Sequence, residues 1–378
     1  MLAVYGIATG EEAEPAATAT PRTETVSYGG APLRRFSVAA TGDILIHGPV
    51  AVRAAANASG NRQYDFRPMF EEIAPIVADA DLGVCHMETP ISPDNANIAS
   101  YPLFNIPTEI AADTRDVGYD LCSTASNHSL DQGADGVVAT IGVLEDAGLA
   151  HTGTAVTARE AKHPPIVEVK GARVATLSYT YGLNGLELPA GEEHLVNVLD
   201  IDRVLRDARR ARRQGAEFVI VALQWGQEFQ KEPTEDQLRG SRRLLRSPLV
   251  DMILGHHTHV VQPVRRIGRE WAVLGMGNVV SNQHPGATAT CCLPETQDGL
   301  LVVLDVTETG DGWRTDLRYV PTWVEPGSFR VLPVARALRD DQIRGEHGDA
   351  LQESWDRTVS IVTALGADED GAEPLETP

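Results

Sequence analysis

Short apolar runs alternate with amphipathic stretches along most of the chain. Apolar runs bounded by turn residues predict strands, and these cover 36–42, 81–88, 119–125, 172–179, 217–223, 250–255, 272–278 and 299–306. Apolar positions at helical spacing predict helices over 67–80, 130–148, 201–215 and 234–246. Strands that alternate with helices indicate largely parallel pairing, because parallel neighbours need a crossover connection. The pattern therefore predicts an α/β fold with a two-layer β-sheet core flanked by helices.

The two ends of the chain lack this periodicity. Residues 1–34 are rich in Ala, Thr, Pro and Glu, which predicts a disordered leader. Residues 367–378 are acidic and contain Pro, which predicts a solvated tail. We therefore expect a single catalytic domain over 35–366.

The charge of the chain excludes two classes of partner. It has 53 acidic and 32 basic residues and a formal net charge of −21. Such a chain repels polyphosphate and anionic lipid, so we expect neither nucleic acid nor membrane as a partner. The apolar start, 2–8, has no basic flank, and no run reaches the length of about 18 apolar residues that spans a bilayer. We expect a cytoplasmic protein.

The four cysteines do not form a recognisable framework. Cys85 and Cys122 lie inside apolar strand-like runs, where cysteine behaves as a small hydrophobic residue. Cys291 and Cys292 are adjacent and have no C-x-x-C spacing. We therefore predict no disulfide framework and no zinc knuckle, which fits a reducing compartment.

Polar side chains gather directly after the predicted strands. Six of the eleven histidines lie in these segments, together with acidic and amide side chains: Asp43, His47, His86, Glu88, Asn127, His128, Asp131, His256, His257 and His259. The carboxyl ends of parallel strands open onto one edge of a sheet, where ligand crevices form. Imidazole and carboxylate together suit Zn, Mn or Fe. The sequence therefore predicts a centre with one or two divalent transition-metal ions.

The H-x-H pair has a simple physical use. In an extended loop alternate residues point to the same side, so the rings of His257 and His259 could approach one metal cluster. His256 would point the other way and is not expected to be a ligand.

Three further residues have expected roles at this centre. Glu88 could bridge two cations, because two metals about 4 Å apart need shared negative charge. Asn127 would offer a neutral carbonyl oxygen. His128, next to it, is better placed as a proton donor or base than as another ligand.

Six blocks in this order resemble the CapA-like family, named for capsule poly-γ-glutamate synthesis proteins. They read GDILIH, ETPI, SNHSLDQG, QWGQE, GHHTHVVQP and GMGN, and the similarity covers roughly 37–325. The resemblance implies a calcineurin-like metallophosphoesterase fold, an αββα sandwich. It also implies metal ligands at Asp43, Glu88, Asn127, His257 and His259, with His128 as acid or base. His47 is a plausible further ligand, although its spacing from Asp43 differs from the D-x-H of true phosphoesterases.

Two positions depart from the family pattern. The block usually written H-W-G is Gln224-Trp225-Gly226 here, so an amide replaces an expected imidazole and should weaken the second metal. We expect Gln224 and Trp225 to contact substrate. The residue two before Glu88, commonly Asn in the family, is His86, which either supports the ligands or acts in catalysis.

Two reactions fit these residues. One is hydrolysis of a phosphoester or amide, with His128 protonating the leaving group. The other is proton transfer at a Cα next to a carboxylate, which needs two acid/base groups, and His128 and His86 could supply them. The family resemblance extends to the epimerase of a lasso-peptide pathway, which inverts the C-terminal residue of a ribosomal precursor peptide. With no membrane anchor visible, the sequence predicts such a metal-dependent peptide epimerase. A CapA-like hydrolase or a non-catalytic metal-stabilised peptide-binding protein are the alternatives.

Overall fold

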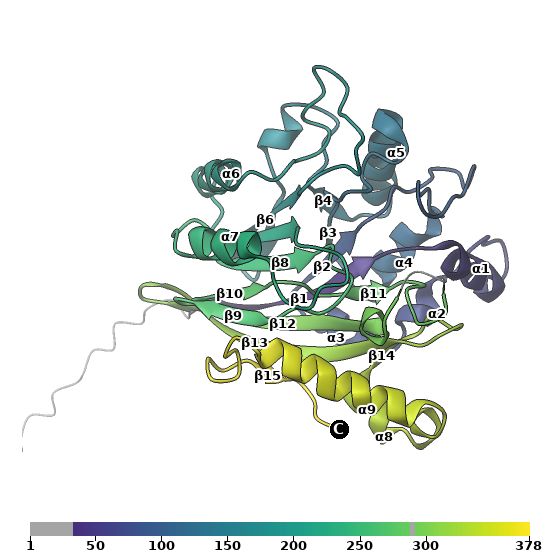
Figure 1. The fold of residues 1–378 in the computed structure, drawn as a ribbon. Helices are drawn as coiled ribbons and strands as arrows, with labels where there is room; N and C mark the ends of the chain where they lie inside the picture. Colours follow the sequence, from purple (N-terminus) through teal and green to yellow (C-terminus); the bar gives the residue numbers. More distant parts are fainter. Residues whose placement is uncertain (1–32, 288–291) are drawn as a thin grey trace, which may run out of the picture. The chain divides into compact units, whose positions relative to one another are not determined.

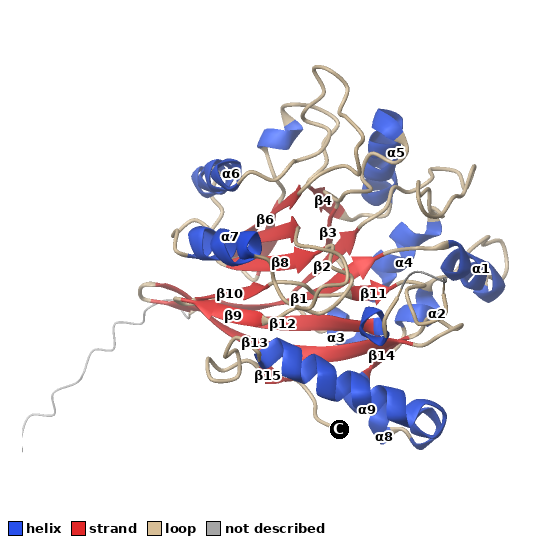
Figure 2. Cartoon of the chain, in the orientation of Figure 1, coloured by secondary structure: helices blue, strands red, loops and turns tan. Residues whose placement is uncertain are grey.

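Two β-sheets packed face to face, with helices on both outer faces, form the centre of the computed structural model, which describes residues 33–287 and 292–378 (Figures 1 and 2). The nine-stranded first sheet has the order β14-β13-β12-β1-β2-β3-β4, with β11 beside β1 and β15 beside β13. The six-stranded second sheet has the order β5-β6-β7-β8-β10-β9. The expected two-layer α/β sandwich is confirmed.

The strands of the first sheet are β1 (Arg35–Ile44), β2 (Leu82–Met87), β3 (Leu121–Ser123), β4 (Ala150–Thr152), β11 (Asn278–Val280), β12 (Asp298–Thr309), β13 (Gly312–Val324), β14 (Val331–Pro333) and β15 (Glu373–Pro374). Those of the second are β5 (Ile166–Val169), β6 (Ala172–Thr180), β7 (Phe218–Gln224), β8 (Met252–His256), β9 (Val264–Ile267) and β10 (Glu270–Val273). The α-helices are α1 (Gly48–Asn57), α2 (Arg67–Phe70), α3 (Ala74–Ala78), α4 (Glu109–Val117), α5 (Gly133–Asp146), α6 (Ile201–Arg213), α7 (Glu235–Leu245), α8 (Val334–Arg339) and α9 (Asp341–Thr363). Short 3-10 helices cover Glu160–Lys162 and Pro294–Gln297.

The central strands are continuous apolar runs because both of their faces are covered. Every residue of β7 is buried, because the first sheet covers one face and helices α6 and α7 cover the other (Figure 1). Phe36 of β1 meets Phe218 of β7 edge to face in the core between the sheets. On the outer side, Val219 packs in a core cluster with Val204 of α6 and Leu244 of α7. The sheets are thereby fixed against each other and against their helices.

Prolines and a terminal strand account for two differences from the expected elements. The helix predicted over 67–80 is interrupted and forms α2 and α3, with Pro75 in the first turn of α3, where its missing N–H costs no hydrogen bond. The segment 367–378, expected as a solvated tail, is mostly exposed or half-buried, but β15 pairs with β13 and Ala367 is fully buried. The predicted leader lies almost wholly outside the described residues.

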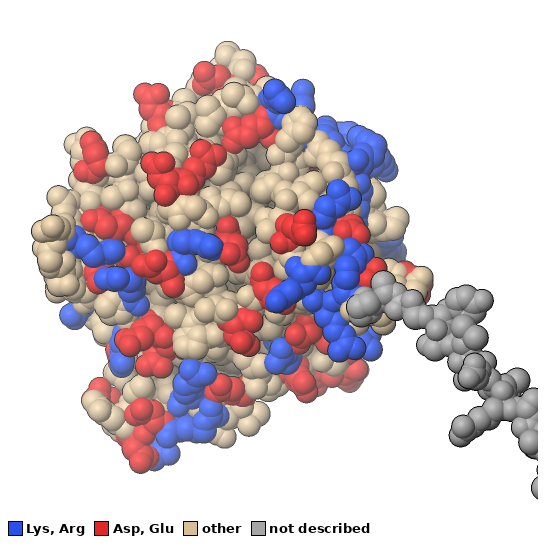
Figure 3. Space-filling view, turned by 180° about the vertical axis from the view of Figure 1, so that it is seen from behind, with Lys and Arg blue, Asp and Glu red and all other residues tan. Residues whose placement is uncertain are grey.

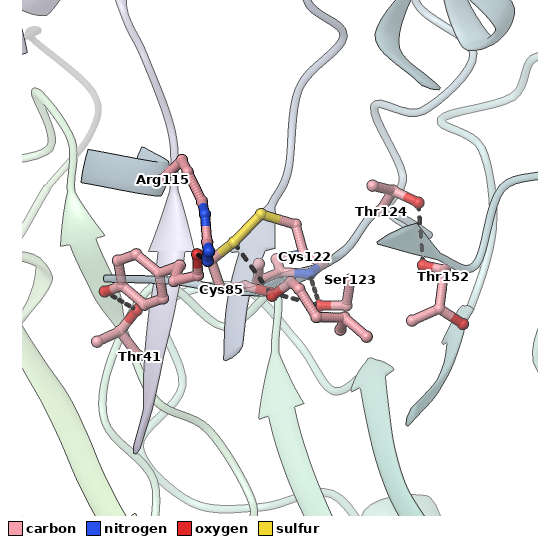
Figure 4. The surroundings of a disulfide bond; sticks show 10 residues. Thr41, Cys85, Arg115, Cys122, Ser123, Thr124 and Thr152 are labelled. Carbon is pink, nitrogen blue, oxygen red and sulfur yellow. Dashed lines mark hydrogen bonds between the residues drawn. A yellow bond between two sulfur atoms is a disulfide. The ribbon is translucent and has the colours of Figure 1, made fainter. Parts of the chain in front are cut away.

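The expectation of no disulfide framework is wrong for one pair of cysteines. Cys85 of β2 and Cys122 of β3 are register partners on adjacent parallel strands, and their sulfurs are bonded (Figure 4). Both side chains are buried. The cysteines therefore give no support for a reducing compartment; Cys291 lies outside the described residues.

Glycines allow backbones to approach closely beside the strand ends. A Cβ on Gly42 would lie 2.1 Å from the carbonyl oxygen of Gly277, and one on Gly255 would lie 2.0 Å from that of Leu274. Gly42 lies within the bulge between Ala40 and Asp43 in the β1–β2 pairing. Bulges re-aim the side chains that follow them, and here the next side chain is that of Asp43.

The surface carries charges of both signs. On the face shown in Figure 3, basic and acidic side chains are interspersed. Within the part of the chain that the structure describes, no helix has the length and apolar character needed to cross a bilayer.

Candidate metal centre

The polar strand ends of both sheets meet in one place. In the first sheet Asp43 is the register partner of His86, and His86 is the partner of Ser123. In the second sheet Gln224 is the partner of His256. Because β1 also contacts β8, these five side chains lie around a common centre at the carboxyl ends of their strands.

Asp43 is fully buried and lies between two sets of side chains. Its Oδ1 accepts a hydrogen bond from His256 Nδ1 at 2.8 Å. Its Oδ2 accepts from the His257 backbone N–H at 3.1 Å and lies 3.5 Å from His259 Nδ1. Burial alone would raise the pKa of Asp43, but the hydrogen bonds from His256 and His259 outweigh it and lower the pKa strongly.

The structure forms two compact groups of possible metal ligands that share Asp43. One is Asp43, Glu88 and His259, and the other is Asp43, His86 and His256. In each, one ligand atom per residue lies within 4.8 Å of the others. The shared carboxylate is therefore Asp43, whereas the sequence predicted Glu88 in the bridging role.

Glu88 and His259 face each other in the first group of possible ligands. Glu88 Oε1 lies 3.7 Å from His259 Nε2, and Glu88 Oε2 is buried with no hydrogen-bond partner among the described residues. Burial raises the pKa of Glu88 to about 7. Burial lowers the pKa of His259, but the neighbouring Glu88 and Asp43 raise it to about 9. Two buried carboxylates therefore face a single imidazole, and one carboxylate oxygen lacks a donor. A bound cation would supply the missing positive charge.

Asn278 is a site residue to which sequence reasoning assigned no role. Its Oδ1 lies 3.0 Å from His259 Nδ1, and its Nδ2 donates to Gln283 Oε1 at 2.9 Å. The amide oxygen accepts only, so His259 Nδ1 donates to it, and Nε2 is the ring nitrogen turned toward Glu88. The sequence feature that could have identified Asn278 is the G-x-G-N block, whose last residue begins β11.

Gln224 occupies the place where the family pattern has an imidazole. Its Nε2 donates to Asn127 Oδ1 at 2.8 Å and to Glu88 Oε1 at 3.3 Å. The carbonyl oxygen of Asn127 is thereby occupied by an N–H donor. The role of Asn127 as a ligand stays a prediction.

The H-x-H segment is not extended as expected. His257 has φ 88° and His259 has φ 53°, both in the left-handed region that non-glycine residues rarely adopt. His257 lies outside both ligand groups; its ring lies 4.4 Å from that of Tyr181, and burial lowers its pKa to about 3. His256 was expected to point away, but as the last residue of β8 it faces Asp43.

His86 lies behind the centre rather than in an open pocket. It is 1% exposed, its ring stacks on that of His256 at 4.1 Å, and its Nδ1 lies 2.8 Å from Ser123 Oγ. Burial lowers the pKa of His86 to about 3. This position favours a supporting or ligand role over direct contact with substrate.

A pocket of about 300 Å³ opens beside the first ligand group. It is lined by Leu45, His47, Tyr101, Phe104, His128, Glu228, Phe229, His259, Asn282, Gln283 and Ala287. Its aromatic side chains and its lack of Lys and Arg among these residues suit a neutral or cationic group better than an anion.

Two imidazoles besides His259 line this pocket. His128 Nδ1 donates to Asp131 Oδ2 at 2.8 Å, which also accepts the Phe104 N–H. The carboxylate therefore fixes the tautomer with the lone pair on His128 Nε2. His47, expected as a ligand, lies instead in the pocket wall and accepts the Asn282 N–H at Nδ1, 3.2 Å away. Burial, followed by the neighbouring His259, lowers the pKa of His47 to about 4.

Trp225 does not reach the pocket. Successive strand residues point to opposite faces, so Gln224 faces the centre and Trp225 packs in the core under α6 and α7. Its Nε1 donates to the Leu274 carbonyl at 3.0 Å. The expectation that Trp225 contacts substrate is wrong.

The family model described as bacterial capsule synthesis protein PGA_cap matches residues 37–283. The chain belongs to this family. The expected CapA-like membership is thereby confirmed, and the matched part of the chain contains every ligand position considered above.

Two curated relatives share about a quarter of their aligned residues with this chain. The capsule biosynthesis protein CapA of Bacillus anthracis is 25% identical over 282 residues, covering 73% of this chain and 65% of that protein. The PGA biosynthesis protein CapA of Bacillus subtilis (strain 168) is 25% identical over 283 residues, covering 72% and 71%. The chain thus spans about 65% of the length of the first of these relatives.

Solved structures also align with the chain. The calcineurin-like phosphoesterase YfkN from Bacillus subtilis aligns over 87% of this chain and 100% of that chain, with 12% identity and a TM-score of 0.44. The NAD nucleotidase NadN of Haemophilus influenzae aligns over 92% and 58%, with 11% identity and a TM-score of 0.45. At these values the alignments carry no argument about function.

Proposed function

We propose that this chain is a divalent-metal-dependent hydrolase that acts on a peptide carbonyl. The observation that carries the proposal is that His128 and His259 line one pocket. His128 is held by Asp131, and His259 belongs to the ligand group with Asp43 and Glu88. An acid/base group and a cation site therefore border the same space.

The residues present fit a resident cation. Glu88 Oε2 is a buried acceptor that no donor among the described residues reaches, and the set of two carboxylates and an imidazole suits Zn, Mn or Fe. Asp43, Glu88 and His259 would hold the ion. When bound, it would polarise a carbonyl oxygen and stabilise the negative charge that develops there.

The remaining steps belong to the side chains of the pocket. The lone pair of His128 Nε2 can accept a proton from an attacking water and return it to the leaving amine. Asp131 keeps the imidazole in this tautomer and stabilises its charged form. Phe104 and Phe229 can exclude water from the bound group.

The pocket wall favours a peptide over a polyanion as substrate. Its described residues include Glu228 and no Lys or Arg, so beyond His259 and the ion that it would hold, a long polyanion such as poly-γ-glutamate would meet no further Lys or Arg side chain there. We therefore do not carry over the capsule and PGA roles in the relatives' names.

The test compares substrate classes on the metal-loaded full chain. Neutral peptide p-nitroanilides should be cleaved, and p-nitrophenyl phosphate should not be preferred. His128→Asn should lower kcat by about 10²- to 10⁴-fold without changing the metal content. Phosphatase activity alone, or full peptidase activity in His128→Asn, would overturn the proposal.

One observation favours a peptide epimerase as the second candidate. His47 and His128 both contact Phe104, with ring centroids 5.5 and 4.8 Å from it. Two imidazoles in one pocket could remove and return a Cα proton, and His47 is better placed for this than the buried His86. Incubation of candidate peptides in D₂O separates the reactions: Cα deuterium without cleavage favours epimerisation, and gain of water favours hydrolysis.

A further inference from the structure

The pocket beside the candidate metal centre is lined by one carboxylate that has no counter-ion. Glu228 lies in the loop after β7, lines the pocket and is exposed to solvent. Among the described residues, no Lys, Arg or His forms an ion pair with it, and Lys231 of the same loop pairs with Glu295 at 3.1 Å instead. The charge of Glu228 is therefore available to a bound group.

Aromatic rings line the same space. Tyr101 and Phe104 lie in the pocket wall with their ring centroids 6.5 Å apart. Phe229 lines the pocket next to Glu228, with its ring 6.0 Å from that of His259. The faces of aromatic rings attract ammonium and guanidinium groups, because the ring quadrupole is negative there. A carboxylate beside such rings suits a cation carried on an alkyl stem.

The backbone holds Phe229 in an unusual conformation. Its φ of 62° lies in the left-handed region, which a bulky residue rarely adopts. Its N–H donates to the Thr258 carbonyl at 2.8 Å, which ties this loop to the segment that carries His259. Residues strained in this way cluster at sites that hold ligands. A ring held in the pocket to contact a bound group accounts for the strain at Phe229.

The imidazoles of the pocket wall are engaged by other carboxylates. His128 Nδ1 donates to Asp131, and His259 Nε2 faces Glu88 at 3.7 Å. The residues that line the pocket include no Lys or Arg that could neutralise Glu228. An unpaired carboxylate favours a cation over a neutral group of the same shape. The pocket therefore selects by charge as well as by volume.

We propose that this pocket binds the side chain of a lysine or arginine residue of the peptide substrate, with Glu228 as the counter-ion of its charged end. Tyr101, Phe104 and Phe229 cover the alkyl stem. The volume of about 300 Å³ admits one long side chain. The inference rests on the proposed function, since it places a basic residue beside the carbonyl that is cleaved. Binding is measured without cleavage, so the two can fail separately.

Calorimetry with small amides on the metal-loaded full chain tests the pocket. Nα-acetyl-lysine amide and Nα-acetyl-arginine amide carry the side-chain cation without a free α-ammonium, and Nα-acetyl-norleucine amide is the neutral match. The basic amides should bind about tenfold more tightly or better, and NaCl at about 1 M should remove most of this difference. Glu228→Gln should abolish the preference with metal content unchanged. Glu232→Gln, which removes an exposed carboxylate of the same loop outside the pocket lining, is the matched control and should keep it.

Cleavage separates failure of this inference from failure of the proposed function. The wild type should cleave Nα-acetyl-lysine p-nitroanilide with a kcat/KM about tenfold above that for the norleucine compound, and Glu228→Gln should bring the ratio toward one. Selective binding of the basic amides without cleavage would refute the hydrolase and support the pocket assignment. Equal binding of the lysine and norleucine amides, the same loss of preference in Glu232→Gln, or loss of metal in Glu228→Gln would each overturn the assignment.

Discussion

Gln224 Nε2 lies 2.8 Å from Asn127 Oδ1, so an amide donor stands beside the oxygen that the family pattern pairs with an imidazole. Asn127 is buried, and this contact satisfies the oxygen that the family resemblance assigns to a metal ion.

Restoring the family imidazole at position 224 should tighten metal binding. In Gln224→His, a neutral imidazole replaces the amide that lies beside Glu88 and Asn127. We expect the affinity for a divalent transition metal to rise about tenfold or more over the wild type, since imidazole is a better donor than an amide. Titration calorimetry measures it. Gln224→Met, which adds no donor, is the control and should bind the metal no more tightly than the wild type.

Removing the charge that orients His128 should slow proton transfer. Asp131→Asn can present an N–H to His128 Nδ1 and so favour the wrong tautomer, which should lower kcat by about 10²-fold or more. KM and metal content should change little, because Asp131 lies in neither ligand group. Steady-state kinetics on the peptide substrate checks this. A large change in metal content with kcat preserved would assign Asp131 a different role.

Glu270 should make stability depend on pH. Burial, with a smaller contribution from Asp251, raises the pKa of Glu270 to about 8, above its ordinary value near 4.5. The protonated form is therefore favoured by folding, and its stabilising contribution is complete below about pH 4.5 and is lost as the pH rises through 8. Glu270→Gln should raise the free energy of unfolding at pH 9 by about 1–2 kcal/mol, allowing for partial exposure, and by little at pH 5. Urea unfolding at both pH values measures it, with the exposed Glu168→Gln as a control that should show no such difference.

Reduction of the disulfide should destabilise the fold. The Cys85–Cys122 bond closes a loop with a sequence separation of 37 residues, and cross-links of this length contribute about 3–4 kcal/mol through the unfolded chain. Cys85→Ala/Cys122→Ala should therefore unfold at lower urea concentration. Peptide mapping without reductant should recover the linked pair. Free thiols at both positions under non-reducing conditions would contradict the prediction.

Much of the fold and several site residues could be predicted because they depend on local pattern. Buried strands such as β7 read as continuous apolar runs, and Asp43, Glu88 and His259 follow strands whose carboxyl ends must converge. His128 was likewise identified by its position after β3. The acid/base role remains a prediction.

The errors arose where a feature depends on register or backbone conformation. The disulfide requires Cys85 and Cys122 to be direct partners, which no spacing of 37 residues reveals. His256 was misassigned because the turn after it is left-handed at His257 rather than extended. Trp225 was misassigned because strand alternation continues one residue beyond Gln224. Asn278 acts through a hydrogen bond to a histidine 19 positions away.

The close approaches at Gly42 and Gly255 have a consequence for how the chain tolerates variation. Each glycine directly precedes a residue of the centre, Asp43 or His256, and any side chain there would collide with the carbonyl oxygen of Gly277 or Leu274. In a library of all single substitutions, these two glycines should therefore score as poorly as the acidic and imidazole positions themselves. A map of intolerant positions would consequently mark the places where two backbone segments approach closely, as well as the polar residues of the centre. Gly42 and Gly255 would be among its most intolerant positions.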